Sequence, residues 1–305
     1  MKDTKHKILT LAALTTIAAG VIHLTNRVIV ASSQLKEMLD FSNHNYYNWR
    51  FGKIYYTKKG KGSPLLLIHD TIPGASGYEW SRVEDQLAQE HTVYTLDLLG
   101  CGRSEKAGIT YTNFLFVQII CDFIKNVIKE KTDIIASGFS CSFVTTAAAY
   151  DKESINKIMF INPVSMISLA QTTTKKDKLF KFFIELPIFG TFIYHIIVSR
   201  ETINDFFLDK LYYNPFHVDK DVLDAYYEAA HKGGYYAKCL YSSQSAKYMN
   251  INIRHAVESI DNSIYIVEGE DEPNGAAIVE AYQKVNPAIE SATIPCSKHF
   301  PHIEN

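Results

Sequence analysis

The stretch DIIASGFSCSF, Asp133–Phe143, decides which fold the chain adopts. It begins with small and β-branched residues that are typical of a buried strand, and it continues into the helix-like run FVTTAAAY. A serine presented for attack on a carbonyl carbon needs a sharp strand-to-helix turn, with small residues two positions away on each side. Gly138 and Ser142 meet that requirement. The stretch therefore predicts a nucleophile elbow with Ser140 at its apex.

Apolar runs of strand length alternate with helical patterns along most of the chain. The best helical pattern covers residues 113–130, where apolar side chains recur on one face. Strands that alternate with helices of this length imply a mostly parallel sheet covered on both faces, which is a doubly wound α/β fold. A second helix is expected over residues 79–90. The expected strands are two in residues 46–59, then those starting at Leu65, His91 and Asp133, and those ending near Pro163, Gly269 and Cys296.

One region interrupts this alternation. Residues 164–262 contain no convincing buried strand and are aromatic and helical. In a parallel sheet, an insertion after the carboxyl end of a strand lies over the crevice where ligands bind. We therefore expect a helical lid after the sixth strand, with a core built from residues 46–163 and 263–305.

The N-terminal residues 1–30 form a separate segment. Ile8–Asn26 contains no Asp, Glu, Lys or Arg, and roughly 20 helical residues suffice to span a membrane. An uncleaved single-pass anchor is the preferred interpretation, while a signal peptide and a buried helix remain alternatives. Lys2, Lys5 and Lys7 precede the apolar run and favour an extracytoplasmic main domain.

Composition excludes several classes of function. A net charge of −2 without a Lys/Arg-rich block gives no reason to expect nucleic acid as a partner. The five cysteines contain no CxxC pair, and the histidines show no metal-binding spacing. No phosphate-binding glycine loop precedes a helix. The sequence therefore predicts neither a metal nor an organic cofactor.

Five motifs in order make the chain resemble the α/β-hydrolase fold family, and in particular its lid-bearing serine hydrolases. The resemblance runs from about Tyr46 to the C-terminus, and the nucleophile, acid and base follow one another in the order of that family. The motifs are LLLIHDTIPGASGYEW (65–80), LDLLGCGRS (96–104), the elbow, IVEGEDEP (266–273) and SKHFPHIE (297–304).

The resemblance implies a catalytic triad. Ser140 is expected to be the nucleophile and His299 its base, with His302 supporting the histidine loop. The family spacing before Pro273 places the acid at Glu272, and Asp271 is the alternative.

The oxyanion hole is expected to consist of the backbone N–H groups of Thr71 and Cys141. The sequence departs from the family at Asp70, where glycine is usual, and at Ser142. Cys141 is a much weaker candidate for the nucleophile, because the elbow presents the residue between the small pairs.

The predicted function is hydrolysis of an ester or related acyl bond through an acyl-enzyme on Ser140. An aromatic lid suggests a small-molecule substrate with an apolar portion. Acyl transfer, thioester hydrolysis and carbon–carbon bond hydrolysis use the same residues and remain alternatives. The departures at Asp70 and Ser142 also leave open a non-catalytic binding protein that kept the fold.

Overall fold

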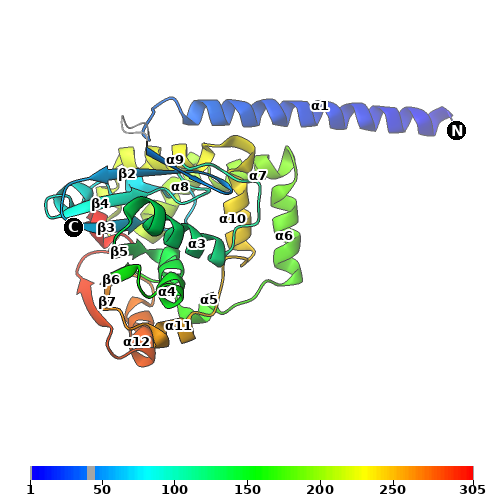
Figure 1. Cartoon of the computed structure of the whole chain (residues 1–305). Helices are drawn as coiled ribbons and strands as arrows, with labels where there is room; N and C mark the ends of the chain where they lie inside the picture. Colours follow the sequence, from blue (N-terminus) through cyan, green and yellow to red (C-terminus); the bar gives the residue numbers. More distant parts are fainter. Residues whose placement is uncertain (1, 40–44, 305) are drawn as a thin grey trace.

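A central sheet with helices on both faces forms the body of the molecule (Figure 1). The computed structural model describes residues 2–39 and 45–304, so the outer ends of the predicted N-terminal segment and core lie outside it. Strand order is β1-β2-β4-β3-β5-β6-β7-β8. β1 and β2, and β2 and β4, pair antiparallel, and all other neighbours are parallel. The predicted doubly wound, mostly parallel sheet is confirmed. The strands are β1 Asn45–Trp49, β2 Gly52–Lys59, β3 Ser63–Ile68, β4 His91–Leu96, β5 Thr132–Ser137, β6 Ile155–Ile161, β7 Ile264–Gly269 and β8 Glu290–Ile294.

The unbroken apolar run of β3 shows why the sheet is buried on both faces. Leu66 and Ile68 belong to the large core cluster beneath α3 and α4, whereas Leu65 and Leu67 pack with Trp80 on the opposite face. Side chains alternate between the faces of a strand, so a strand covered on both sides needs apolar residues at every position.

Short helices and turns connect the strands of the core. The predicted helix over residues 79–90 is instead a 3₁₀ turn, Gly77–Trp80, followed by the single turn α2. Both Glu79 and Trp80 are buried. The helices of the core are α2 Glu84–Leu87, α3 Asn113–Phe123, α4 Cys141–Tyr150, α12 Gly275–Val285 and α13 Pro301–Glu304.

The helical insert follows β6, as predicted, and ends before β7. Its own aromatic cluster includes Tyr194, Phe207 and Tyr226, and it packs against Phe300 of the loop after β8. The insert therefore rests on the carboxyl edge of the sheet. Its helices are α5 Met166–Leu169, α6 Lys175–Glu185, α7 Phe189–Ile197, α8 Arg200–Phe206, α9 Lys220–His231, α10 Lys238–Ser245 and α11 Arg254–Ser259.

The first helix, α1 (Lys2–Ser33), extends far beyond the rest of the molecule (Figure 1). Its C-terminal part contacts the insert, where the Asn26 side chain donates a hydrogen bond to the carbonyl of Ile188 (3.0 Å). Within the described residues, His6–Ser33 is long and apolar enough to cross a membrane. The sharply bent pair α6–α7 also passes that test if it is taken as one span.

Candidate functional site

Four loops meet at the carboxyl edge of the sheet. They follow β3, β5, β7 and β8, and they carry Asp70, Gly138, Glu272 and His299 respectively. The carboxyl ends of parallel strands lie at one edge, which is where open α/β sheets bind ligands.

The imidazole of His299 lies between two carboxylates. Its Nδ1 is 3.3 Å from Oε1 of Glu272, and its Nε2 is 3.2 Å from Oδ2 of Asp70. The structure thus brings together the predicted base and the preferred acid, while the side chain of the alternative acid, Asp271, is exposed. Ser140 is not the partner of Nε2.

The histidine loop is held by residues that the sequence analysis did not select. The Asn162 side-chain amide, just after β6, donates to the carbonyls of Lys298 (2.8 Å) and His299 (2.9 Å). From the insert, the carbonyl of Leu211 accepts a hydrogen bond from the backbone N–H of His299 (3.1 Å). The position of His299 therefore depends on both the sheet and the insert.

Asp70 lies at the centre of the site. Its Oδ1 accepts hydrogen bonds from the backbone N–H groups of Thr71 (2.6 Å) and Phe139 (2.8 Å), while Oδ2 faces His299. The residue is only 2% exposed. Two converging N–H groups are the arrangement that stabilises a developing oxyanion. Here they hold a carboxylate of the protein itself.

The elbow differs from its predicted register. Gly138, the first residue after β5, has the left-handed backbone (φ +53°), whereas Ser140 is helical with φ −64°. The Ser140 hydroxyl is buried and donates to the carbonyl of His69 (2.6 Å). The apex of the turn is therefore Gly138, and the predicted presentation of Ser140 to His299 is not observed.

The same shift of two residues changes the predicted oxyanion donors. The backbone N–H groups that converge on Asp70 belong to Thr71 and Phe139, whereas the prediction named Thr71 and Cys141. The backbone N–H of Cys141 is used in the 3₁₀ turn, where it donates to the carbonyl of Phe139. The thiol of Cys141 is fully buried, and burial raises its pKa well above the ordinary value, which disfavours the thiolate that a nucleophile needs.

Asp70 and Gly138 fit together. A Cβ added to Gly138 would lie 2.2 Å from Cγ of Asp70 and closer than 3 Å to both carboxylate oxygens. The carboxylate therefore occupies the space in which a side chain at the apex would begin. An aspartate can replace the usual glycine after His69 because the apex carries no side chain.

The two neighbouring carboxylates change the pKa of His299. Burial alone would lower its pKa, but hydrogen bonds and negative charge from Asp70 and Glu272 outweigh burial and raise the pKa to about 10. The two carboxylates thus favour the protonated form of the ring.

Glu79 holds the loops that carry Asp70 and Gly138. It is buried and accepts hydrogen bonds from the backbone N–H of Asp70 (3.0 Å) and from the Ser137 hydroxyl. His302 lies 3.5 Å from the same carboxylate and stacks on Trp80, which is the supporting position expected for it. Glu79 carries no such signal in the sequence, where it begins the helical pattern of residues 79–90.

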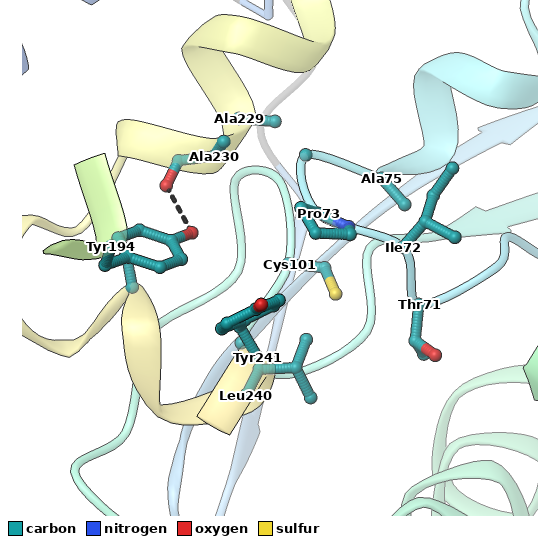
Figure 2. A pocket seen from close by; sticks show the side chains of 13 residues that line it. Thr71, Ile72, Pro73, Ala75, Cys101, Tyr194, Ala229, Ala230, Leu240 and Tyr241 are labelled. Carbon is teal, nitrogen blue, oxygen red and sulfur yellow. Dashed lines mark hydrogen bonds between the residues drawn. The ribbon is translucent and has the colours of Figure 1, made fainter. Parts of the chain in front are cut away.

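A small cavity adjoins Thr71 (Figure 2). Its volume of about 20 Å³ is room for about one water molecule. It lies between the loop at residues 71–75 and the insert, where the Tyr194 hydroxyl donates to the carbonyl of Ala230 (2.8 Å; Figure 2). The walls expose both polar and apolar atoms, and at this volume a larger ligand requires the insert to move. Within the described ranges no cluster of three or more His, Cys, Asp or Glu could hold a metal ion.

Comparisons with known proteins extend over most of the chain. Residues 65–305 match the Alpha/beta hydrolase family. A 2-hydroxy-6-oxo-6-(2'-aminophenyl)hexa-2,4-dienoic acid hydrolase of Metapseudomonas resinovorans is 28% identical over 114 residues, which is 37% of this chain and 39% of that protein. A soluble epoxide hydrolase of Corynebacterium sp. is 29% identical over 109 residues, 36% of this chain and 37% of that protein. The chain thus spans about two fifths or less of these curated relatives.

Two solved structures show the same fold. A serine hydrolase involved in carbazole degradation, the CarC enzyme, superimposes with a TM-score of 0.70 at 19% identity, over 86% of this chain and 93% of that one. A membrane phospholipase A, described as a bacterial virulence factor, has a TM-score of 0.67 at 17% identity and covers 99% of this chain and 94% of its own.

Proposed function

Because the chain belongs to the alpha/beta hydrolase family, we propose that it is a hydrolase whose reaction is centred on the imidazole of His299. The observation that carries the proposal is the position of this ring between two carboxylates, beside two converging backbone N–H groups. A histidine oriented by an acid can move protons to and from water and a leaving group. The aromatic cluster of the insert, which includes Tyr194, Phe207 and Tyr226, supports a small substrate with an apolar portion.

The predicted acyl-enzyme on Ser140 is the second candidate. Support for ester hydrolysis comes from a relative, the pimeloyl-[acyl-carrier protein] methyl ester esterase of Aliivibrio fischeri, which is 33% identical over 67 residues. For this route Asp70 must leave the two N–H donors, and Ser140 must give up its bond to the carbonyl of His69. Carbon–carbon bond hydrolysis, thioester hydrolysis and acyl transfer on Ser140 meet the same obstacle.

The proposed function predicts that His299→Gln loses turnover by roughly 10²–10⁴-fold, the usual contribution of general acid–base catalysis. The measurement is hydrolysis of p-nitrophenyl butyrate and of styrene oxide by the full chain in detergent. His255→Gln is the matched control, because the His255 side chain is exposed on α11 and faces Glu258 of the same helix. Equal rates for wild type and His299→Gln would place the reaction elsewhere, and no turnover of either compound by the wild type would favour a non-catalytic binding protein.

We further propose that α1 is an uncleaved single-pass anchor that holds the insert at the membrane surface. Along α1, Ile8, Leu14 and Val21 are exposed, and on the insert Phe182 and Ile196 are exposed as well. Apolar patches of this kind mark contact with lipid or with another protein. The proposal that the main domain is extracytoplasmic is based on the positive charges of Lys2, Lys5 and Lys7. The side chains of Lys2 and Lys5 lie outside the described structure.

The anchor predicts that the full chain floats with phosphatidylcholine vesicles and stays with them in alkaline carbonate. Leu14→Lys/Ile17→Lys should release the protein into the soluble fraction, because each charge costs roughly 2.5–3.5 kcal/mol at the centre of a membrane helix. Thr4→Lys, near the start of α1, is the matched control. A mature protein whose N-terminus begins after α1 would identify a cleaved signal peptide instead.

A further inference from the structure

We propose that the groove between α1 and α7 binds the headgroup of an anionic phospholipid that also carries hydroxyl groups, with the phosphate on Arg27 and the first part of an acyl chain beside it. The groove is separate from the loops that carry Asp70 and His299, neither of which lines it. The inference rests on the proposed anchor and names the class of lipid that the anchored protein would select.

The groove is a cavity of about 570 Å³ where the C-terminal part of α1 meets the insert. Its apolar lining includes Val30 and Ala31 from α1, and Pro187 and Ile188 from the bend between α6 and α7. Cavities of roughly 300–1,000 Å³ hold small organic ligands. The groove is therefore large enough for a phosphate headgroup and several methylene groups of an acyl chain.

The length of α1 places this groove at the level of lipid phosphates. Lys7 precedes the apolar run of α1, and Arg27 follows it. At 1.5 Å per residue the two charged residues lie roughly 30 Å apart along the helix, which is the thickness of the hydrocarbon core. With Lys7 at one membrane surface, Arg27 and the cavity beside it lie in the headgroup layer of the other.

The charges around the groove favour an anion. Arg27 lines it with an exposed side chain, and among the described lining residues none is acidic. Behind the wall, Nζ of the buried Lys238 donates a hydrogen bond to the hydroxyl of Thr191, which also lines the groove (3.0 Å). Glu185, whose charge acts on Lys238, is itself paired with Lys181. A phosphate on the guanidinium of Arg27 would accept a charge-assisted hydrogen bond there.

Two buried side chains of the groove lack hydrogen-bond partners in the described structure. Asn26 is 7% exposed and its amide donates to the carbonyl of Ile188 (3.0 Å), but its Oδ1 accepts from no group. His195 is 3% exposed, and neither ring nitrogen has a partner. Buried polar atoms without partners cost free energy, which a ligand reaching them by rotation of these side chains would recover. The amide oxygen needs a donor and the imidazole offers an N–H, so a headgroup with hydroxyl groups beside its phosphate suits both.

The backbone of the groove is strained at Ile188. This residue has φ +59° and ψ −67°, a conformation that a β-branched side chain rarely adopts. It lies where α6 and α7 bend by 103°, and the amide of Asn26 holds its carbonyl. Strained residues persist where the surrounding structure holds them, and they cluster at ligand sites. The strain at Ile188 therefore agrees with a binding site in this groove.

The test measures lipid binding by the full chain in detergent. Native mass spectrometry follows a titration with dioctanoyl phosphatidylglycerol and a second titration with dioctanoyl phosphatidylcholine. We expect one saturable phosphatidylglycerol per chain, and binding of phosphatidylcholine that is weaker by about 10-fold, because this lipid has neither a net charge nor hydroxyl donors.

Two variants locate the site. Arg27→Gln should weaken phosphatidylglycerol binding by about 10-fold, since it removes a hydrogen bond to a charged group. Ala31→Trp fills the groove from an exposed position on α1 and should weaken binding by at least as much. Arg254→Gln is the matched control, because Arg254 is an exposed arginine on α11 outside the groove, and its affinity should equal that of the wild type.

Several outcomes would overturn the lipid site. These are equal affinity for the two lipids, and phosphatidylglycerol binding that is unchanged in both Arg27→Gln and Ala31→Trp. Displacement of the lipid by an equal concentration of inorganic phosphate would identify a free phosphate as the ligand instead. A dimer that Ala31→Trp dissociates would identify a second copy of the chain in the groove.

Flotation with phosphatidylcholine vesicles separates this proposal from the anchor on which it rests. If Arg27→Gln floats like the wild type while neither binds phosphatidylglycerol, the anchor stands and the lipid site falls. A wild-type chain that does not float, or a mature protein without α1, would contradict the anchor, and the groove beside α1 falls with it.

Discussion

Gly138→Ser should lower the free energy of unfolding by about 3 kcal/mol. Two costs contribute, namely overpacking and a left-handed backbone at a non-glycine residue. The new Cβ would lie 2.2 Å from Cγ of Asp70, and the position has φ +53°. The measurement is the shift of the thermal unfolding midpoint of the full chain. Gly234→Ser is the matched control, because Gly234 has φ +59° but no atom within 4 Å of its Cβ position. It should show only the backbone cost of about 1 kcal/mol.

The double variant Asp70→Gly/Gly138→Ser should recover most of the lost stability. Removal of the carboxylate makes space for the new serine, so the two substitutions should couple by about 2 kcal/mol in a double-mutant cycle. The new serine would stand beside His299 and the N–H groups of Thr71 and Phe139, and we expect it to react with a fluorophosphonate probe. Additive destabilisation and an unlabelled serine would show that Asp70 does not occupy the place of an apex side chain.

The sheet and the insert were predictable because each depends on the presence or absence of apolar runs in the local sequence. Parallel strands buried on both faces must be apolar at every position, as in Leu65–Ile68, and an insert without such runs cannot belong to the sheet. His299 and Glu272 were predictable because each follows a recognisable strand by a short loop. Because β7 and β8 are neighbours in the sheet, these two loops lie side by side at its carboxyl edge.

The register of the elbow was not predictable in the same way. Small residues two positions apart occur at Ala136, Gly138, Ser140 and Ser142, so the sequence fits an apex at Gly138 as well as one at Ser140. The choice depends on where β5 ends, which is Ser137. Asp70 was the available signal, since a carboxylate in place of the usual glycine needs space that only a glycine apex leaves. Glu79 and Asn162 act through contacts between distant segments, which no local pattern reveals.

Arg103→Leu should destabilise the protein by about 3–5 kcal/mol, the usual cost of leaving one partner of a buried ion pair alone. Asp97, just after β4, is fully buried and accepts hydrogen bonds from Nε (2.8 Å) and Nη2 (3.0 Å) of Arg103. It also accepts from the backbone N–H of Gly77 (2.7 Å). Burial opposes the charge of Asp97, but Arg103 outweighs burial and lowers the pKa of the carboxyl to about 2.

The stabilisation by the Asp97–Arg103 pair depends on pH. The pKa of Asp97 is lower in the folded protein than in the unfolded chain, so the pair stabilises the fold above the ordinary carboxyl pKa, and this stability is lost as the pH falls towards 2. The difference between wild type and Arg103→Leu should therefore be largest near neutral pH and shrink in acid. Lys284→Leu, which removes the exposed pair with Glu280, should cost only about 0.3–0.5 kcal/mol. A loss of unfolding free energy in Arg103→Leu as small as that in Lys284→Leu would contradict the prediction. It would mean that water reaches Asp97 and solvates its charge.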